Sequence, residues 1–86
     1  MIERSPAQIL VYSRPGCHLC EVLIEQLLPL VADKLTVKVV NIESDDALIS
    51  RHGARIPVVE FRSHEVCHYH LDVPAVQAIL DDIDNS

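Results

Sequence analysis

Aromatic residues are scarce in this chain of 86 residues, which has two tyrosines, one phenylalanine and no tryptophan. The core of the fold must therefore be built from leucine, isoleucine and valine. Hydrophobic residues make up 49% of the sequence and charged residues 23%, a balance typical of a globular domain and not of a disordered segment. A chain of this length buries only about 60% of its unfolded surface, so we expect one compact domain over residues 1–86.

Basic residues are also few. Seven lysines and arginines stand against thirteen acidic residues, which gives a formal net charge of −6 at pH 7. Nucleic acids and anionic membrane surfaces are bound through basic patches, so we expect neither as a partner. No apolar run approaches the length of a membrane span, and residues 1–6 lack the apolar core of a signal peptide. We therefore expect a cytoplasmic protein, in which cysteines are more often catalytic or metal-binding than structural.

Cysteine is sparse as well, but two of the three cysteines stand at a chemically useful place. Cys17 and Cys20 follow an apolar run over residues 8–12 and open the longest helical pattern of the chain, over residues 17–31. Two cysteines three residues apart at the start of a helix lie on one face, within disulfide range. Free backbone N–H groups and the positive end of the helix dipole stabilise the first thiolate. This arrangement indicates a dithiol redox centre.

The next segment predicts a second strand and a short helix. Residues 35–42 are rich in β-branched side chains and fit a strand parallel to the first, reached through a right-handed helical crossover. Ser44 as the N-cap and Gly53 as the stop predict a helix over residues 45–52.

The last third of the chain predicts a hairpin and a final helix. Residues 57–61 and 65–69 indicate two strands joined by a turn at residues 62–64. A helix follows from about residue 72 to residue 83, with its apolar residues on one stripe. The predicted order of elements is βαβαββα.

The segment from Tyr12 to Cys20, YSRPGCHLC, resembles the active-site stretch of the glutaredoxins, a family with the thioredoxin fold. That stretch has a basic residue three positions before the first cysteine, which Arg14 matches. Arg55-Ile56-Pro57 is similar to the family's Thr-Val-Pro triplet, whose proline is cis and faces the two cysteines. The resemblance covers roughly residues 8–83. It implies an α/β, thioredoxin-like fold: a four-stranded mixed sheet flanked by three helices, with the first cysteine exposed and the second recessed.

Three departures from the family pattern point to an atypical, glutaredoxin-like branch. The inner pair of the motif is His18-Leu19 in place of Pro-Tyr. Cys67-His68 stands where the family keeps two glycines, which leave room for the γ-glutamyl end of glutathione. Asp72 is a shifted match to a carboxylate that opens the last helix of the family. The resemblance makes glutathione a candidate co-substrate, but the side chains at positions 67 and 68 predict weak or absent binding.

Cys17 and Cys20 are the predicted catalytic residues. The thiolate of Cys17 attacks a substrate disulfide, and Cys20 then attacks Cys17 and releases the reduced substrate. Because burial disfavours a thiolate, Cys20 stays protonated until the mixed disulfide forms. The structural alternative is a pair of ordinary buried cysteines at a chance spacing.

Six further residues are candidates for binding the substrate. Arg14 and Arg55 can each hold a substrate carboxylate, and a plain surface arginine is the alternative for both. His18, when protonated, stabilises the neighbouring thiolate, unless it is simply a solvated residue of the first turn. The resemblance implies that backbone next to a cis proline pairs with an extended substrate. The candidates are therefore Arg14, His18, Arg55, Ile56, Pro57 and Asp72.

Cys67 has no obvious partner among the cysteines. Alternation places it on the face opposite His64, His68 and His70, which counts against a compact metal cluster in the hairpin. We expect a small apolar residue that packs on the sheet, and a third redox thiol near Cys17 is the alternative.

The predicted function is that of an enzyme, a thiol–disulfide oxidoreductase that reduces disulfides of proteins or of low-molecular-weight thiols. We expect it to act as a monomer without a bound metal or cofactor. The main alternative is a metal or iron–sulfur protein that uses the Cys17/Cys20 pair. A partner-binding module with negligible turnover is the third hypothesis.

Overall fold

The computed structural model describes residues 7–84, which form one mixed sheet, three α-helices and a short 3-10 helix. The elements are β1 (Gln8–Ser13), α1 (His18–Val31), β2 (Thr36–Asn41), η1 (Ile42–Ser44), α2 (Asp46–His52), β3 (Val58–Phe61), β4 (His64–His68) and α3 (Val73–Asp84). The predicted order βαβαββα is confirmed. Residues 1–6, on which the expectation about a signal peptide rests, lie outside the described part, as do residues 85–86.

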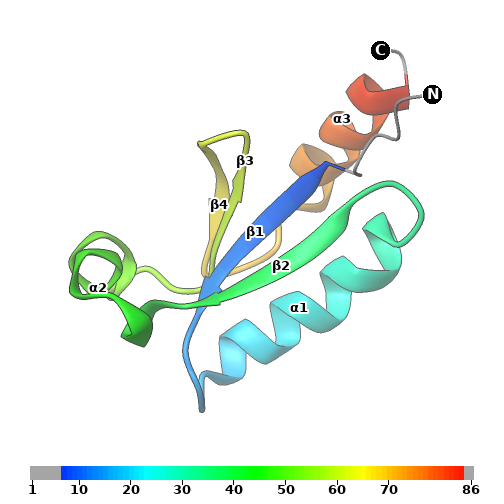
Figure 1. Cartoon of the computed structure of the whole chain (residues 1–86). Helices are drawn as coiled ribbons and strands as arrows, with labels where there is room; N and C mark the ends of the chain where they lie inside the picture. The colour runs from blue at the N-terminus through cyan, green and yellow to red at the C-terminus, as the bar shows by residue number, and fades with distance from the viewer. Residues whose placement is uncertain (1–6, 85–86) are drawn as a thin grey trace.

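The four strands stand in the order β2-β1-β3-β4 (Figure 1). β1 and β2 are parallel, as the predicted helical crossover requires, and β3 is antiparallel to both β1 and β4. The four-stranded mixed sheet and three helices are the α/β, thioredoxin-like architecture implied by the sequence resemblance. Within residues 7–84, no helix is both long enough and apolar enough to cross a membrane.

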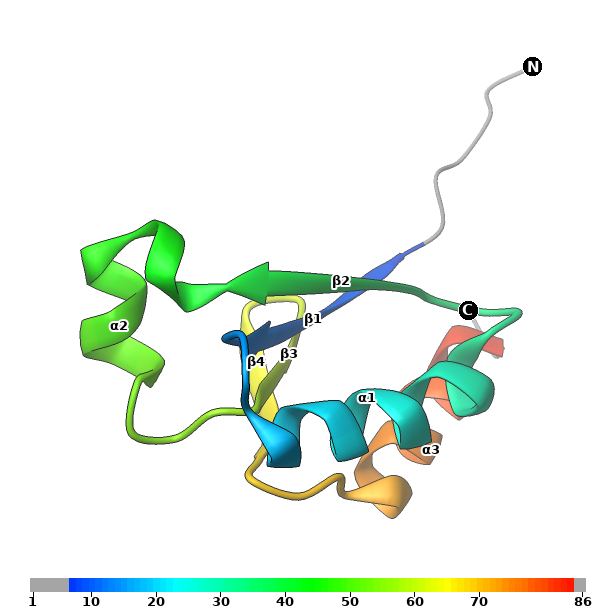
Figure 2. The same cartoon turned by 90° about the horizontal axis from the view of Figure 1, so that it is seen from below.

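The helices cover the sheet unequally. α1 and α3 lie on the same side of it (Figure 2), where their buried residues join those of β1 and β3 in one core cluster. That cluster consists of Ile9, Val11, Leu23, Leu27, Val31, Leu35, Val59, Phe61, Val76 and Leu80. α2 packs through Leu48 against a second, smaller cluster formed by Tyr12, Cys20, Ile42, Ile56 and Val58. The core is aliphatic, as the scarcity of aromatic residues predicts.

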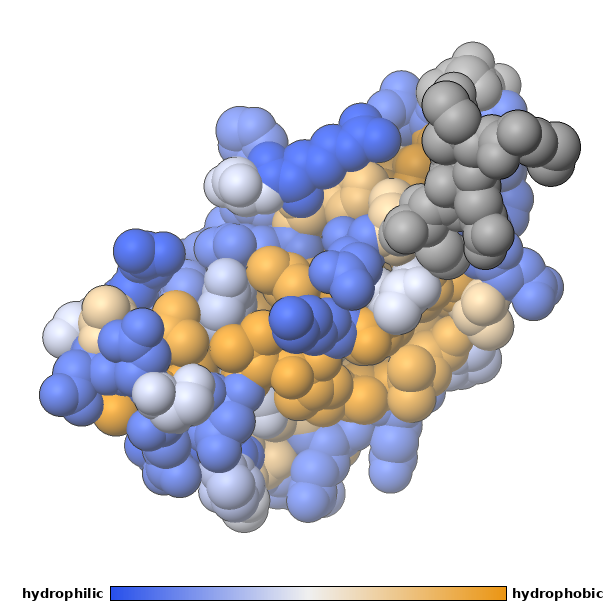
Figure 3. Space-filling model, in the orientation of Figure 1, coloured by the Kyte–Doolittle hydropathy of each residue, from blue (hydrophilic) through white to orange (hydrophobic). Residues whose placement is uncertain are grey.

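Apolar side chains also reach the surface. Figure 3 shows them gathered on the face of the molecule where β2 and α1 lie in Figure 1. Val39 of β2 and Leu28 of α1 are among the exposed large apolar residues. β2 is also an edge strand of the sheet, so one row of its backbone N–H and C=O groups has no neighbouring strand to pair with.

The predicted N-cap of the second helix is wrong by one residue. Asp45 caps α2, because its side chain accepts a hydrogen bond from the N–H of Ala47 at 2.8 Å. Ser44 closes η1 instead, where its hydroxyl donates to the carbonyl oxygen of Asn41 at 2.7 Å. Serine and aspartate are both good caps, so the 3-10 turn before α2 decides between them. Gly53 follows α2 as predicted, and a Cβ there would lie 2.6 Å from the carbonyl oxygen of Ile49.

The hairpin turn is shorter than predicted. It consists of Arg62 and Ser63, which have φ angles of 52° and 67°, while His64 already belongs to β4. Two consecutive residues with positive φ form the two-residue turn that matches the twist of a hairpin.

A β-bulge in this hairpin corrects the prediction about the faces of β4. Val59 pairs with Cys67, but Phe61 pairs with His64, so the register shifts by one residue between them. Because Val59 and Phe61 share a face of β3, His64 lies on the same face as Cys67, not opposite it. His68 pairs with Val58 and does lie on the opposite face, as predicted.

Candidate active site

A tight turn delivers the first cysteine to the start of α1. The backbone N–H of Cys17 donates to the carbonyl oxygen of Arg14 at 3.3 Å, and Gly16 between them has a φ of +79°. Proline at the second position and glycine with positive φ at the third are the residues that a type II turn requires. Pro15 and Gly16 therefore end β1 sharply and place Cys17 at the N-cap of α1.

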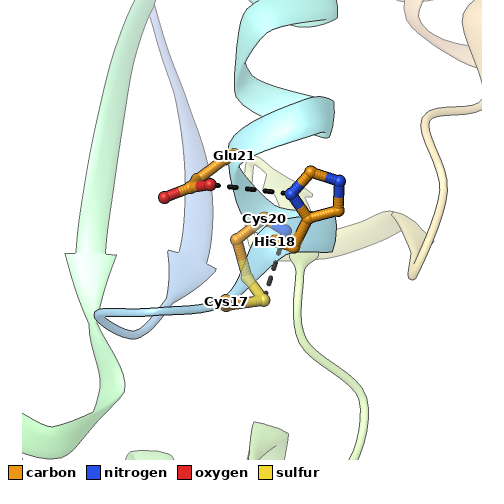
Figure 4. The surroundings of a disulfide bond; sticks show 4 residues. All are labelled: Cys17, His18, Cys20 and Glu21. Atoms are coloured by element: carbon orange, nitrogen blue, oxygen red, sulfur yellow. Dashed lines mark hydrogen bonds and ion pairs between the residues drawn. A yellow bond between two sulfur atoms is a disulfide. The ribbon is translucent and has the colours of Figure 1, made fainter.

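Cys17 and Cys20 form a disulfide, with their Cα atoms 5.2 Å apart (Figure 4). The sulfur of Cys17 also accepts a hydrogen bond from the N–H of Cys20 at 3.2 Å. Cys17 is partly exposed, whereas Cys20 lies on the buried stripe of α1 with only 1% of its surface exposed. The sulfur at the helix N-terminus is thus the one that a second molecule can reach.

The segment before β3 faces this pair. The Ile56–Pro57 bond is cis, as the resemblance implies. Ile56 belongs to the same core cluster as Cys20, and Cys17 packs against that cluster. Pro57 is fully buried, and its carbonyl oxygen accepts from the N–H of Tyr69 at 2.9 Å. The structure therefore places Ile56 in the cluster that also holds Cys20 and contacts Cys17, with Pro57 as its neighbour in the chain.

Arg55 is already engaged by an acidic side chain. One of its guanidinium nitrogens, Nη2, lies 2.5 Å from Oε1 and 2.6 Å from Oε2 of Glu65 on β4. Nδ1 of His68 lies 3.0 Å from Oε2 of the same carboxylate. Partial burial raises the pKa of Glu65, but the hydrogen bonds with His68 and Arg55 outweigh it, so the pKa of this carboxyl is lower than usual. The sequence predicted neither contact, and the contact between Arg55 and Glu65 depends on how β4 pairs with β3.

The other predicted binding residues are exposed. Arg14 lies in the turn that precedes Cys17. The side chain of His18 is 87% exposed, and its Nδ1 lies 3.8 Å from Oε1 of Glu21 (Figure 4). Asp72 directly precedes α3, and its carboxylate accepts a hydrogen bond from the N–H of Ala75 at 3.1 Å. For these three residues a role in binding substrate stays a prediction.

Cys67 is half-buried and packs against the larger core cluster, which confirms the expectation that it packs on the sheet. Burial raises the pKa of its thiol, and a hydrogen bond from the backbone of Asp72 offsets only part of that effect. Within residues 7–84, no three histidine, cysteine, aspartate or glutamate side chains form a group that could hold a metal ion.

Sequence reasoning missed a polar group beneath the site. His52 of α2 is 3% exposed, and its ring stacks on that of Tyr12 with centroids 4.1 Å apart. The hydroxyl of Tyr12 donates to Oε1 of Glu60 at 3.2 Å, and Nε2 of His52 lies 3.9 Å from Oε2 of that glutamate. Burial raises the pKa of Tyr12, and the charge of Glu60 raises it further. Tyr12, His52 and Glu60 come from three separate elements, so no local sequence pattern links them.

These elements define a protein of the thioredoxin fold with a dithiol–disulfide pair at the start of its first helix. Within that class, the chain belongs to the glutaredoxin-like family, because residues 8–81 match the Glutaredoxin-like domain (DUF836).

Solved structures agree with this assignment. Protein Ne2328 from Nitrosomonas europaea, determined by solution NMR, is 33% identical with a TM-score of 0.76, over 92% of this chain and 96% of that one. The X-ray structure of target protein XcR50 from X. campestris is 31% identical with a TM-score of 0.65, over 86% and 96% of the two chains. A structure of a malarial protein, 10% identical with a TM-score of 0.58, shares the fold alone. No curated protein matches the sequence.

Proposed function

We propose that this protein is a thiol–disulfide oxidoreductase that reduces disulfides of proteins or of low-molecular-weight thiols, with Cys17 as the nucleophile and Cys20 as the resolving cysteine. The observation that carries the proposal is the asymmetry of the pair. The sulfur of Cys17 is partly exposed at the N-cap of α1, while Cys20 is buried one turn further on within bonding distance.

The first step is an attack by the thiolate of Cys17 on one sulfur of the substrate disulfide. The substrate S–S bond breaks, a mixed disulfide with Cys17 forms, and the first substrate thiolate leaves and takes a proton from water. The free N–H groups of the first helical turn favour the attacking thiolate, and the N–H of Cys20 already points at that sulfur.

In the second step Cys20 loses its proton and attacks the sulfur of Cys17. The mixed disulfide breaks, the second substrate thiol leaves, and the protein keeps the Cys17–Cys20 disulfide. The substrate has then gained two electrons and two protons. An external thiol reductant, either a small thiol or a dithiol protein, returns the pair to its reduced form.

The surroundings of the site suggest how substrates bind. Ile56 shares a core cluster with the cysteine pair, and a cis bond joins it to Pro57, so an extended substrate segment can align along the backbone of these two residues. Arg14 lies exposed in the turn before Cys17, and His18 is the exposed first residue of α1, so both are close to Cys17 in the chain. We also propose that the protein works in the cytoplasm as a monomer, without a bound metal or cofactor, and that Asp72 contributes to substrate binding.

Glutathione is proposed to be a poor co-substrate. Cys67 and His68, at the end of β4, carry side chains where glutaredoxins keep bare backbone for the γ-glutamyl group. When the ¹⁵N-labelled protein is titrated with glutathione, the changes in NMR chemical shift should therefore be small and should not reach saturation. Saturable shifts around Arg14, Ile56 and Asp72 would instead support a glutathione-dependent enzyme.

The roles of the cysteines can be tested by trapping. The reduced Cys20→Ser variant should accumulate a mixed disulfide with a small disulfide substrate, detected by mass spectrometry, because the resolving thiol is missing. Cys17→Ser should form none, and Cys67→Ser serves as the matched control that should behave like the wild type. Equal trapping by Cys17→Ser, or failure of the wild-type pair to oxidise, would contradict the proposal.

A further inference from the structure

A compact group of charged side chains lies beside the segment that faces the cysteine pair. It consists of Arg55, Glu65 and His68, which we call the Arg55 cluster. Both carboxylate oxygens of Glu65 lie within 2.6 Å of the same guanidinium nitrogen of Arg55. His68 contacts both partners, with its Nδ1 3.0 Å from Glu65 and 3.3 Å from Arg55.

The Arg55 cluster borders the proposed substrate site. Arg55 directly precedes Ile56 and Pro57, and Ile56 packs in the same core cluster as Cys20. The chain segment that leads into β3 passes beside the disulfide (Figure 4). Tyr69, which follows β4, is hydrogen-bonded to this segment. Its backbone N–H donates to the carbonyl oxygen of Pro57, and its hydroxyl donates to the carbonyl oxygen of Ala54. A substrate that aligns along Ile56 therefore meets the Arg55 cluster next.

The cluster is also open to solvent. The side chain of Arg55 is 42% exposed and that of Glu65 is 32% exposed, so a bound molecule can reach the guanidinium. A guanidinium is the best protein group for holding a carboxylate, and Arg55 is in this respect a ready site for an anionic substrate. Glu65 fills that site from within the protein.

We propose that Glu65 determines substrate specificity, because it occupies Arg55 and so disfavours disulfides that carry carboxylates relative to neutral or cationic ones. A substrate carboxylate must displace Glu65, and the displaced carboxylate then loses its guanidinium partner and stands beside a second negative charge. Neutral and cationic disulfides require no such displacement. This inference rests on the proposed oxidoreductase function and adds the charge class of the substrate.

The test uses three small disulfides of similar size that differ in charge: dithiodiglycolate, which is anionic, bis(2-hydroxyethyl) disulfide, which is neutral, and cystamine, which is cationic. The reduced protein is mixed with each, quenched with an alkylating agent, and the Cys17–Cys20 disulfide is quantified by mass spectrometry. Mass detection suits this chain because it has no tryptophan to report the change. The measured quantity is the ratio of the anionic rate constant to the neutral one.

Glu65→Gln should raise this ratio by roughly two- to five-fold, the range expected when one exposed ion pair is removed. The corresponding ratio of the rate constant for cystamine to that for the neutral disulfide should stay constant or fall. Asp82→Asn removes the same charge at the far end of α3, and it should leave both ratios at the wild-type value.

A double variant separates competition for Arg55 from a general change of charge. If Glu65 acts through Arg55, the gain seen in Glu65→Gln should vanish in Arg55→Gln/Glu65→Gln, since no guanidinium is left to accept the substrate carboxylate. Three results would overturn the inference about Glu65 and leave the proposed oxidoreductase function intact. They are an unchanged ratio in Glu65→Gln, an equal gain in Asp82→Asn, and a gain that persists in the double variant. If the wild type reduces not even the neutral disulfide, the proposed function falls, and the inference falls with it.

Discussion

Replacing His52 with phenylalanine should stabilise the protein, and the gain should grow as the pH falls. Neither ring nitrogen of His52 has a hydrogen-bond partner among the described residues, although the side chain is almost fully buried. A buried polar group without a partner costs about 1–3 kcal/mol, and phenylalanine retains a ring that can stack on Tyr12. Because phenylalanine is slightly larger than histidine, we expect a net gain of about 1 kcal/mol at pH 7.5.

The dependence on pH follows from the ionisation of His52. Burial lowers its pKa below the ordinary value of 6.5, the carboxylate of Glu60 offsets part of this, and Arg51 lowers it again. In the unfolded chain, His52 therefore takes up a proton near pH 6.5, whereas in the folded chain it stays neutral at that pH. The free energy of unfolding consequently decreases as the pH falls below that value. The loss approaches about 1.4 kcal/mol per pH unit well below pH 6.5, which sets an upper limit of about 1.4 kcal/mol between pH 7.5 and pH 5.5.

Urea unfolding of the oxidised protein, followed by far-ultraviolet circular dichroism, measures both effects. The difference between His52→Phe and the wild type should be about 1 kcal/mol at pH 7.5 and should be larger at pH 5.5, by no more than about 1.4 kcal/mol. At pH 7.5 the variant should melt roughly 4–8 °C higher. The titration of Glu65 does not contribute between pH 5.5 and pH 7.5, because the pKa of that carboxyl is lower than usual. A difference that does not change with pH would show that His52 is not held neutral by burial.

Three further predictions concern capping, packing and the third cysteine. Asp45→Ala should lower the free energy of unfolding by about 1 kcal/mol because Asp45 caps α2, whereas Ser44→Ala, which removes no contact with α2, should cost less. If urea titrations instead showed a larger loss of stability for Ser44→Ala than for Asp45→Ala, Ser44 would be the cap. Leu27→Ala should cost about 2–5 kcal/mol because Leu27 is fully buried, while Leu28→Ala, at a position 48% exposed, should change stability by less than about 0.5 kcal/mol. Cys67→Ser should leave the rate of disulfide exchange unchanged, since Cys67 packs against the core, and a large loss in the same assay would make it a redox thiol.

The cysteine pair is a feature that local sequence determines almost completely. A spacing of three residues places both sulfurs on one side of a helix, and the apolar stripe of α1 decides that Cys20 is the buried one. Pro15 and Gly16 determine the turn, because proline sets φ at one position and glycine accepts a positive φ at the next. Short-range steric rules are sufficient for each of these features.

The order of the elements and the parallel pairing of β1 with β2 also follow from the sequence. Hydrophobic periods of two and of 3.6 residues distinguish strands from helices, and a helical crossover between neighbouring strands is right-handed. The cis bond before Pro57 was implied by family resemblance alone, since no local pattern requires it.

Only the tertiary structure decided which charged residues act together. Arg14 and Arg55 were both candidate substrate-binding residues in the sequence, but the pairing of β3 with β4 places Glu65 against Arg55 and leaves Arg14 in an exposed turn. Likewise, His52 meets Tyr12 and Glu60 because α2 folds over β1 and β3. The bulge beside Val59 shifts the register by one residue, and each residue beyond it changes face. Such contacts depend on strand register and on packing between distant segments, which the local order of residues does not encode.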